Sequence, residues 1–157
     1  MEKRRIVITG IGVVSPIGIG CQNFVEALRE GKSGASYIEH FDTTNYNSKF
    51  AGLVKDFHPE EFIDKKKVRR SARFVQLGLA AAKMAIEDSG LDLEKEDKTR
   101  IGCITGTGIG GLDVLEEEHT SLISKGPRRV SPFLIPMMIS NMLPGEIAIE
   151  YGFMGPN

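Results

Sequence analysis

Two short apolar runs in the sequence each end at a glycine, and a helical pattern follows later in the chain after each of them. The first run is residues 5–9 before Gly10, and the second is residues 100–105 before Gly106. Runs of this kind, rich in β-branched residues, predict strands that are buried on both faces. Alternation of such strands with helices is typical of proteins in which helices cover a sheet. The sequence therefore predicts a layered α/β fold.

Helical spacing of apolar residues predicts four helices. They cover residues 21–30, 71–89 and 112–124, and a last helix that Pro136 opens towards Tyr151. We expect Pro144 to kink this last helix, because a proline inside a helix removes one backbone hydrogen bond. Residues 50–54 are predicted to form an edge strand, and the polar residues 32–47 are predicted to form a loop.

The predicted sheet is incomplete. A length of 157 residues fits one domain or part of a larger one. Only about three strands are predicted, whereas a typical sheet has about five or six. The chain ends on a turn signal, Gly155–Asn157, and not on a natural helix end. We therefore expect part of a larger α/β unit.

The charge balance excludes some classes of partner. A net charge of −1 gives no global field that would favour nucleic acid or a membrane surface. No apolar run approaches the ~20 residues of a membrane span. The N-terminus lacks the apolar region of a secretory signal. We therefore expect a cytoplasmic protein with no nucleic-acid or membrane partner.

Gly106–Gly111 is a complete G-x-G-x-x-G motif between a predicted strand and a predicted helix. Such loops bind dinucleotides, so a Rossmann-like nucleotide-binding domain is one alternative. Against it, no acidic residue follows at the tip of a next strand, and the helix opens with acids that would repel a pyrophosphate. A second loop, Gly10–Ser15, lacks the third glycine, and we interpret it as a tight turn.

Neither cysteine is predicted to be a nucleophile. Cys21 lies near a helix N-terminus without a histidine nearby in the sequence, and Cys103 lies in a predicted buried strand. The three histidines are scattered, without the spacing of a metal site. We therefore expect no metal and no cofactor.

Cations gather in two clusters on this nearly neutral chain. The first cluster consists of Lys65, Lys66, Lys67, Arg69 and Arg70, and the second of Arg128 and Arg129. Clusters of this kind are often only solvated surface. The alternative is a docking site for an acidic partner, because complementary charge speeds encounter and orients a complex.

The order of short segments along the chain resembles one enzyme family. The segments are residues 4–18, Phe41-Asp, Phe50-Ala-Gly, Asp88-Ser-Gly-Leu91, Gly106–Gly111, Glu117-Glu-His-Thr120, residues 126–133 and residues 152–156. In this order they resemble the β-ketoacyl-acyl-carrier-protein synthase II family, the condensing enzymes of fatty-acid elongation. The resemblance extends over the whole chain.

This resemblance implies a thiolase-like fold, layered α-β-α-β-α, with two similar halves and a homodimer. Residues 1–157 would be the N-terminal part of the first half, without the remainder of that half and without the C-terminal half. The family's reaction uses a cysteine nucleophile and two histidines, supported by a lysine and a phenylalanine. None of these groups is expected in this chain, and the cysteine is expected just after Asn157. Residues 1–157 alone are therefore expected to be inactive.

The resemblance also assigns roles to residues that the chain does carry. Ile109 takes the place of the residue that gates the acyl pocket, Phe133 matches a residue at the pocket and dimer contact, and Ile135 and Met138 flank it. The docking surface for acyl carrier protein would consist of Lys66, Arg69, Arg70, Arg128 and Arg129. A non-catalytic module for carrier-protein binding or dimerisation is a further alternative.

Overall fold

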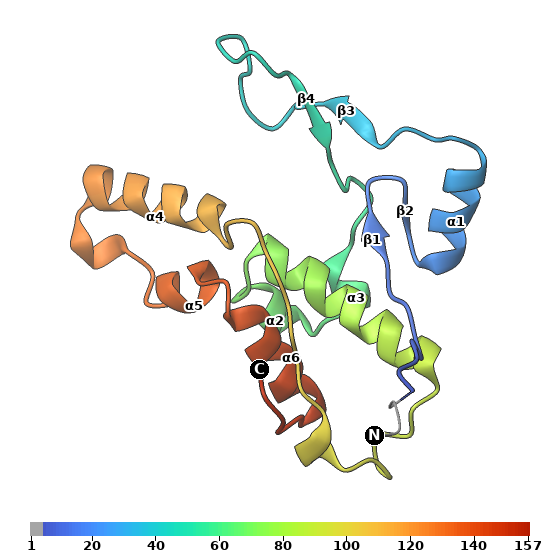
Figure 1. The fold of residues 1–157 in the computed structure, drawn as a ribbon. Coiled ribbons are helices and arrows are strands. Elements are labelled where there is room, and N and C mark those ends of the chain that lie inside the picture. Colours follow the sequence, from blue (N-terminus) through green and yellow to red (C-terminus); the bar gives the residue numbers. More distant parts are fainter. Residues whose placement is uncertain (1–4) are drawn as a thin grey trace. The chain divides into compact units, whose positions relative to one another are not determined.

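The computed structural model describes residues 5–157, which divide into two compact units (Figure 1). The first unit takes in the described residues up to His58 together with Ala81–Gly90. The second consists of Pro59–Ala80 and Leu91–Asn157. Residues 1–4 lie outside the described residues. They are part of the N-terminal sequence in which no secretory signal was predicted.

The strands of the first unit form two small antiparallel pairs. Strand β1 (Val14–Ser15) pairs with β2 (Gly18–Ile19), and β3 (Ala35–Tyr37) pairs with β4 (Phe50–Gly52). The Ser15 hydroxyl closes the first turn, because it donates to the Gly18 carbonyl and accepts from the Ile17 amide. The edge strand predicted at residues 50–54 is thus confirmed over residues 50–52, whereas β3 lies inside the segment that was predicted to be a loop.

The predicted buried strand at residues 5–9 is wrong. Ile6 is 92% exposed and Ile8 is 85% exposed, and no strand pairs with this segment among residues 5–157. A strand forms only where a neighbouring strand takes up its backbone hydrogen bonds. The next residues are held instead by the helix α3 (Arg73–Ser89), since the Ile11 amide donates to the Asp88 carboxylate at 2.9 Å.

The two glycines that follow this segment let the backbone approach α3 closely. A Cβ atom on Gly10 would lie 2.1 Å from the Ala85 carbonyl oxygen, and one on Gly12 would lie 1.9 Å from the Ala81 carbonyl oxygen. Close backbone packing therefore requires glycine at both positions. This contact explains the glycines of the Gly10–Ser15 loop without a bound nucleotide.

The helices of the second unit are α2 (Lys65–Val68), the first part of α3, α4 (Leu112–Lys125), α5 (Leu134–Met138) and α6 (Met142–Tyr151). Three short 3-10 helices accompany them: η1 (Pro59–Glu61), η2 (Lys98–Arg100) and η3 (Pro127–Arg129). In Figure 1, α4 and α5 lie alongside each other. The buried residues of the helices α3 and α6 are Val75, Leu79, Ala80, Leu143, Pro144 and Ile147. At Gly78 these two helices approach so closely that a Cβ would lie 2.5 Å from the Leu143 methyl carbons.

The long helices agree with the sequence prediction. The helix α1 (Cys21–Arg29) covers the segment predicted at residues 21–30, and α4 covers the one predicted at 112–124. The helix predicted at residues 71–89 is α3, which begins at Arg73 because the backbone turns between α2 and α3. Among residues 5–157, no helix combines the length and the apolar character that crossing a membrane requires.

The end of the chain departs from the prediction in two ways. Residues 100–105 form no strand, although Cys103 is buried and its amide donates to the Pro156 carbonyl at 2.9 Å. The predicted last helix is two helices, α5 and α6, separated at residues 139–141. Pro144 is the third residue of α6, so the expected kink is wrong. In the first helical turn a backbone N–H has no partner inside the helix, and a proline removes nothing there.

Candidate functional site

The first basic cluster lies on α2 and on the turn after it. The Asp64 carboxylate begins the helix by accepting from the Lys66 amide at 2.8 Å, which is the usual role of an aspartate at this position. The Ser71 hydroxyl lies at the other end, 2.9 Å from the Lys67 carbonyl and 3.4 Å from the Val68 carbonyl. The three cations predicted to dock a partner, Lys66, Arg69 and Arg70, are all exposed.

The second basic cluster lies on η3, directly after α4. Arg128 and Arg129 are both exposed. Within residues 5–157, the structure records no ion pair for Lys66, Arg69, Arg70, Arg128 or Arg129. All five predicted docking cations therefore present charge to solvent in the second unit.

One contact joins the first basic cluster to the predicted acyl-pocket residues. The guanidinium carbon of Arg70 lies 5.1 Å from the centroid of the Phe133 ring, within the range of a cation–π interaction. Phe133 comes four residues after Arg129 and directly before α5. Sequence reasoning assigned these two residues to different roles and did not predict that they touch.

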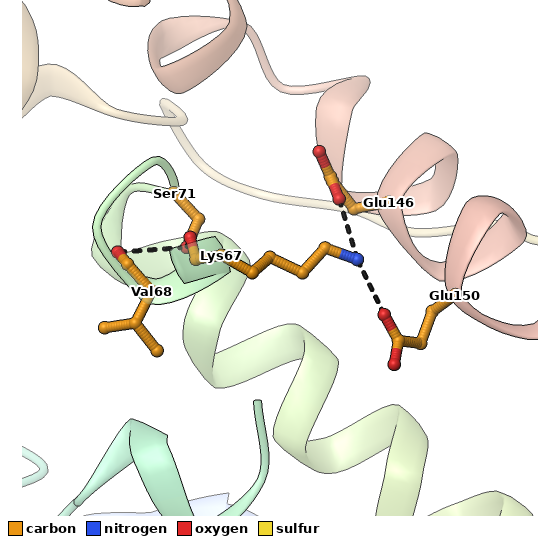
Figure 2. A network of polar contacts seen from close by, with 5 residues as sticks. All are labelled: Lys67, Val68, Ser71, Glu146 and Glu150. Atoms are coloured by element: carbon orange, nitrogen blue, oxygen red, sulfur yellow. Dashed lines mark hydrogen bonds and ion pairs between the residues drawn. The ribbon is translucent and has the colours of Figure 1, made fainter. Parts of the chain in front are cut away.

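Lys67 differs from its neighbours in the first basic cluster. Its Nζ lies 2.9 Å from a Glu146 oxygen and 2.8 Å from a Glu150 oxygen, both on α6 (Figure 2). Burial by itself lowers the pKa of Lys67, but the hydrogen bonds and charges of Glu150 and Glu146 outweigh it, so that the pKa of Lys67 is raised above 10.5. This lysine is therefore charged and paired within the protein.

The predicted acyl-pocket residues lie on two segments that touch. Ile109 belongs to the loop before α4, Ile135 and Met138 belong to α5, and Phe133 directly precedes α5. The Gly111 amide donates to the Met138 carbonyl at 3.0 Å, which docks the loop on α5. Ile109 is 70% exposed, Ile135 is 55% exposed and Phe133 is 40% exposed. The structure thus brings these side chains to neighbouring segments and leaves much of their apolar surface open.

The same docking explains part of the glycine motif at residues 106–111. A Cβ on Gly110 would lie 2.5 Å from the Met138 carbonyl oxygen, and one on Gly111 would lie 2.4 Å from the Met137 carbonyl oxygen. Gly110 also has a φ of 87°, in the left-handed region that favours glycine. Packing against α5 therefore accounts for two glycines of the motif.

An open hollow of about 360 Å³ lies beside this loop. Its lining includes Thr105, Gly106, Thr107, Ser140 and Asn157. Cys103 also lines it, but burial raises the pKa of the Cys103 thiol, which therefore stays protonated and weakly nucleophilic at neutral pH. No group of three or more His, Cys, Asp or Glu side chains in the described part of the chain is arranged to hold a metal ion.

Comparison with known proteins identifies close relatives. Residues 3–157 match the family described as "Beta-ketoacyl synthase, N-terminal domain". The chain is 49% identical over its whole length to 3-oxoacyl-[acyl-carrier-protein] synthase 2 of Vibrio harveyi and 50% identical to the protein of the same name from Vibrio cholerae. It spans 38% of the length of each of these relatives.

Solved structures agree with this result. The ishigamide ketosynthase/chain length factor matches 99% of the chain with a TM-score of 0.89 and 30% identity, and the chain covers 39% of that protein. A type II polyketide ketosynthase complex, AntDE:AntF, matches 97% of the chain with a TM-score of 0.81 and 24% identity, and the chain covers 40% of it. These matches confirm the predicted thiolase-like α/β fold class, and none of the comparisons favours the Rossmann-like alternative.

Proposed function

The chain belongs to the β-ketoacyl synthase N-terminal domain family, and from this membership we propose that it forms the N-terminal part of a β-ketoacyl-acyl-carrier-protein synthase of fatty-acid elongation. In the proposed reaction, an acyl group passes from acyl carrier protein to a cysteine thiolate, and the carrier thiol leaves. Malonyl-acyl-carrier-protein then loses carbon dioxide, and the resulting carbanion attacks the acyl thioester. A carbon–carbon bond forms and the cysteine thiolate is released.

The role proposed for residues 1–157 is to dock the carrier and to build the wall of the acyl pocket. The reacting groups are proposed to lie elsewhere, with the nucleophilic cysteine just after Asn157. Cys103 does not suit that role, because burial raises the pKa of its thiol. This part of the enzyme therefore contributes binding and positioning, which lower a barrier by holding the reactants in place.

The observation that carries this proposal is the set of exposed cations without a recorded ion pair in the second unit. The net charge of the chain is −1, so that attraction of an acidic partner depends on such local groups. We propose that Lys66, Arg69, Arg70, Arg128 and Arg129 bind acyl carrier protein. The names of the two Vibrio relatives include the acyl carrier protein, which supports this partner.

We also propose that Ile109, Phe133, Ile135 and Met138 line the acyl pocket and a homodimer contact. Three of them expose much of their surface, and large exposed apolar side chains on adjoining segments are typical of surfaces that bind a partner or a ligand. The proposed location of the enzyme is the cytoplasm.

Titration with acyl carrier protein tests this function. Labelled carrier protein, followed by fluorescence anisotropy, is expected to bind the protein saturably and to dissociate as salt is added, because screening weakens charge pairing. Parallel titrations with NAD, NADP and ATP are expected to show no saturable binding. Nucleotide binding without carrier-protein binding would overturn the proposal.

A further inference from the structure

Lys67 lies within the first basic cluster, yet its ammonium points to acids of the same unit. Figure 2 shows the side chain of Lys67 extended towards Glu146 and Glu150, with Nζ between the two carboxylates. The side chain is 20% exposed, whereas Lys66 directly before it and Arg69 two residues after it are exposed residues. The charge of Lys67 is therefore balanced inside the protein and is not presented to a partner.

The ion pairs of Lys67 affect both α6, which carries the two acids, and the short helix α2. Glu146 and Glu150 are four residues apart on one face of α6, so their like charges repel unless a cation lies between them. The helix α2 has only four residues, Lys65–Val68, far fewer than a helix needs to be stable by itself. The order of α2 therefore depends on its contacts with the rest of the unit. Gln76 of α3 donates to the Val68 carbonyl at 3.1 Å, and Lys67 links α2 to α6.

We propose that Lys67 is a positioning residue that clamps α2 onto α6 and thereby fixes the directions of the neighbouring cations Lys66, Arg69 and Arg70 for a carrier protein. This inference rests on the proposed function for its partner. The clamp itself, however, is a property of the protein alone. Lys67 acts through its neighbours and does not touch the partner.

Variants of Glu146 and Glu150 can show whether these acids act by positioning α2 or only by their negative charge. If Glu146 and Glu150 acted only as negative charges near a basic surface, removing them would strengthen binding of an acidic carrier protein. If they act through Lys67, removing them releases α2 and weakens binding. The double variant Glu146→Gln/Glu150→Gln therefore gives opposite results under the two explanations.

Glu60 and Glu61 provide a matched control. They are exposed acids on η1, which contacts α2, and no ion pair is recorded for them among residues 5–157. Glu60→Gln/Glu61→Gln removes the same charge without touching the clamp. We expect the clamp variant to bind carrier protein roughly threefold more weakly than wild type, the scale of a modest ion pair. The control is expected to bind equally well or more tightly.

Hydrogen exchange tests the clamp without any partner. The backbone amides of Val68 and Arg69 are expected to exchange faster in Lys67→Met and in Glu146→Gln/Glu150→Gln than in wild type, because released segments open more often. Lys67→Arg, which keeps the charge, is expected to restore both slow exchange and carrier-protein binding. The Glu60→Gln/Glu61→Gln control is expected to exchange like wild type.

Each result decides the inference. Unchanged exchange in the clamp variants, or clamp variants that bind carrier protein as tightly as the control, would overturn it. If the wild-type protein binds no carrier protein, the proposed function fails, and the exchange measurement still decides whether the clamp exists.

Discussion

Arg70 places its guanidinium over the ring of Phe133, 5.1 Å from the ring centroid. This contact links a predicted docking residue to a predicted pocket residue. A partner bound at Arg70 would therefore be separated from the predicted pocket residue Phe133 by one side chain. A cation–π contact at an exposed position contributes about 0.5–1 kcal/mol. The strength of this link is therefore measurable.

A double-mutant cycle with Arg70→Gln and Phe133→Leu checks the contact. Leucine keeps the apolar bulk but removes the face of the ring, so we expect a coupling of about 0.5 kcal/mol in the free energy of unfolding. The matched control is Arg69→Gln with Phe133→Leu, for which no coupling is expected, since no contact between Arg69 and the ring is recorded. Equal coupling in both cycles would show that general charge effects, and not the ring contact, are being measured.

The close approach of α3 and α6 predicts a strong effect at a single glycine. Gly78→Ala would place a Cβ 2.5 Å from the Leu143 methyl carbons, so one helix must shift or Leu143 must move. We expect a loss of about 1–3 kcal/mol in the free energy of unfolding, measured by urea denaturation. In a double-mutant cycle, Gly78→Ala is expected to cost less in the background of Leu143→Ala than in wild type, because the methyl carbons that the new Cβ would contact are absent.

Gly145 is the control for this substitution. It lies inside α6, and a Cβ there meets no atom within 4 Å. Gly145→Ala is therefore expected to stabilise the protein by up to about 1 kcal/mol, because alanine favours a helix over glycine. A similar loss at both positions would contradict the packing explanation.

The helices were predictable from the sequence because their signal is local. Apolar residues at helical spacing locate α3 and α4. The strands were not predictable in the same way. Residues 5–9 and 100–105 have the composition of buried strands, but a strand forms only against a neighbouring strand, and that neighbour is often far away in the sequence.

The site was predictable in its residues but not in its contacts. The basic run at residues 65–70 is visible in the sequence, and the family resemblance suggested which cations dock a partner. Nothing in that run separates Lys67 from Lys66, because the difference lies in α6, where Glu146 and Glu150 supply the partner carboxylates. The spacing of these two acids was a signal for a shared cation, although it did not specify which one.

Charge reversal on η3 tests the docking surface. Arg128→Glu/Arg129→Glu is expected to weaken binding of acyl carrier protein at least tenfold at low salt and to flatten the dependence of affinity on salt, since attraction becomes repulsion. Binding is measured by anisotropy over a range of salt concentrations. Arg29→Glu/Lys32→Glu makes the same charge change at exposed positions of the first unit and should have a much smaller effect. Equal effects of the two reversals would leave net charge, and not a site, as the cause.

A polypeptide limited to residues 1–157 is expected to show no condensing activity. The thiol of Cys103 is held protonated by burial, and the groups proposed for the reaction lie outside this range. The measurement is formation of β-ketoacyl product from acyl- and malonyl-acyl-carrier-protein, with Cys21→Ser/Cys103→Ser as the control. Turnover above background that disappears in the control would contradict the assignment.

The clamp predicts how stability depends on pH. The pKa of Lys67 in the folded protein is raised above 10.5, the value of a free lysine, because the two glutamates outweigh the effect of burial. At neutral pH, well below 10.5, Lys67 is charged in both states, and its ion pairs stabilise the folded state in full. As the pH rises further, the unfolded chain loses this proton first, so the contribution of Lys67 declines and disappears as the pH passes the folded-state pKa. The quantity to measure is the difference in the free energy of unfolding between wild type and Lys67→Met, in which contributions common to both proteins cancel. This difference is expected to be constant from neutral pH to about pH 9 and to shrink above it. A difference that stays constant at higher pH would mean that the charge of Lys67 does not hold α2 to α6.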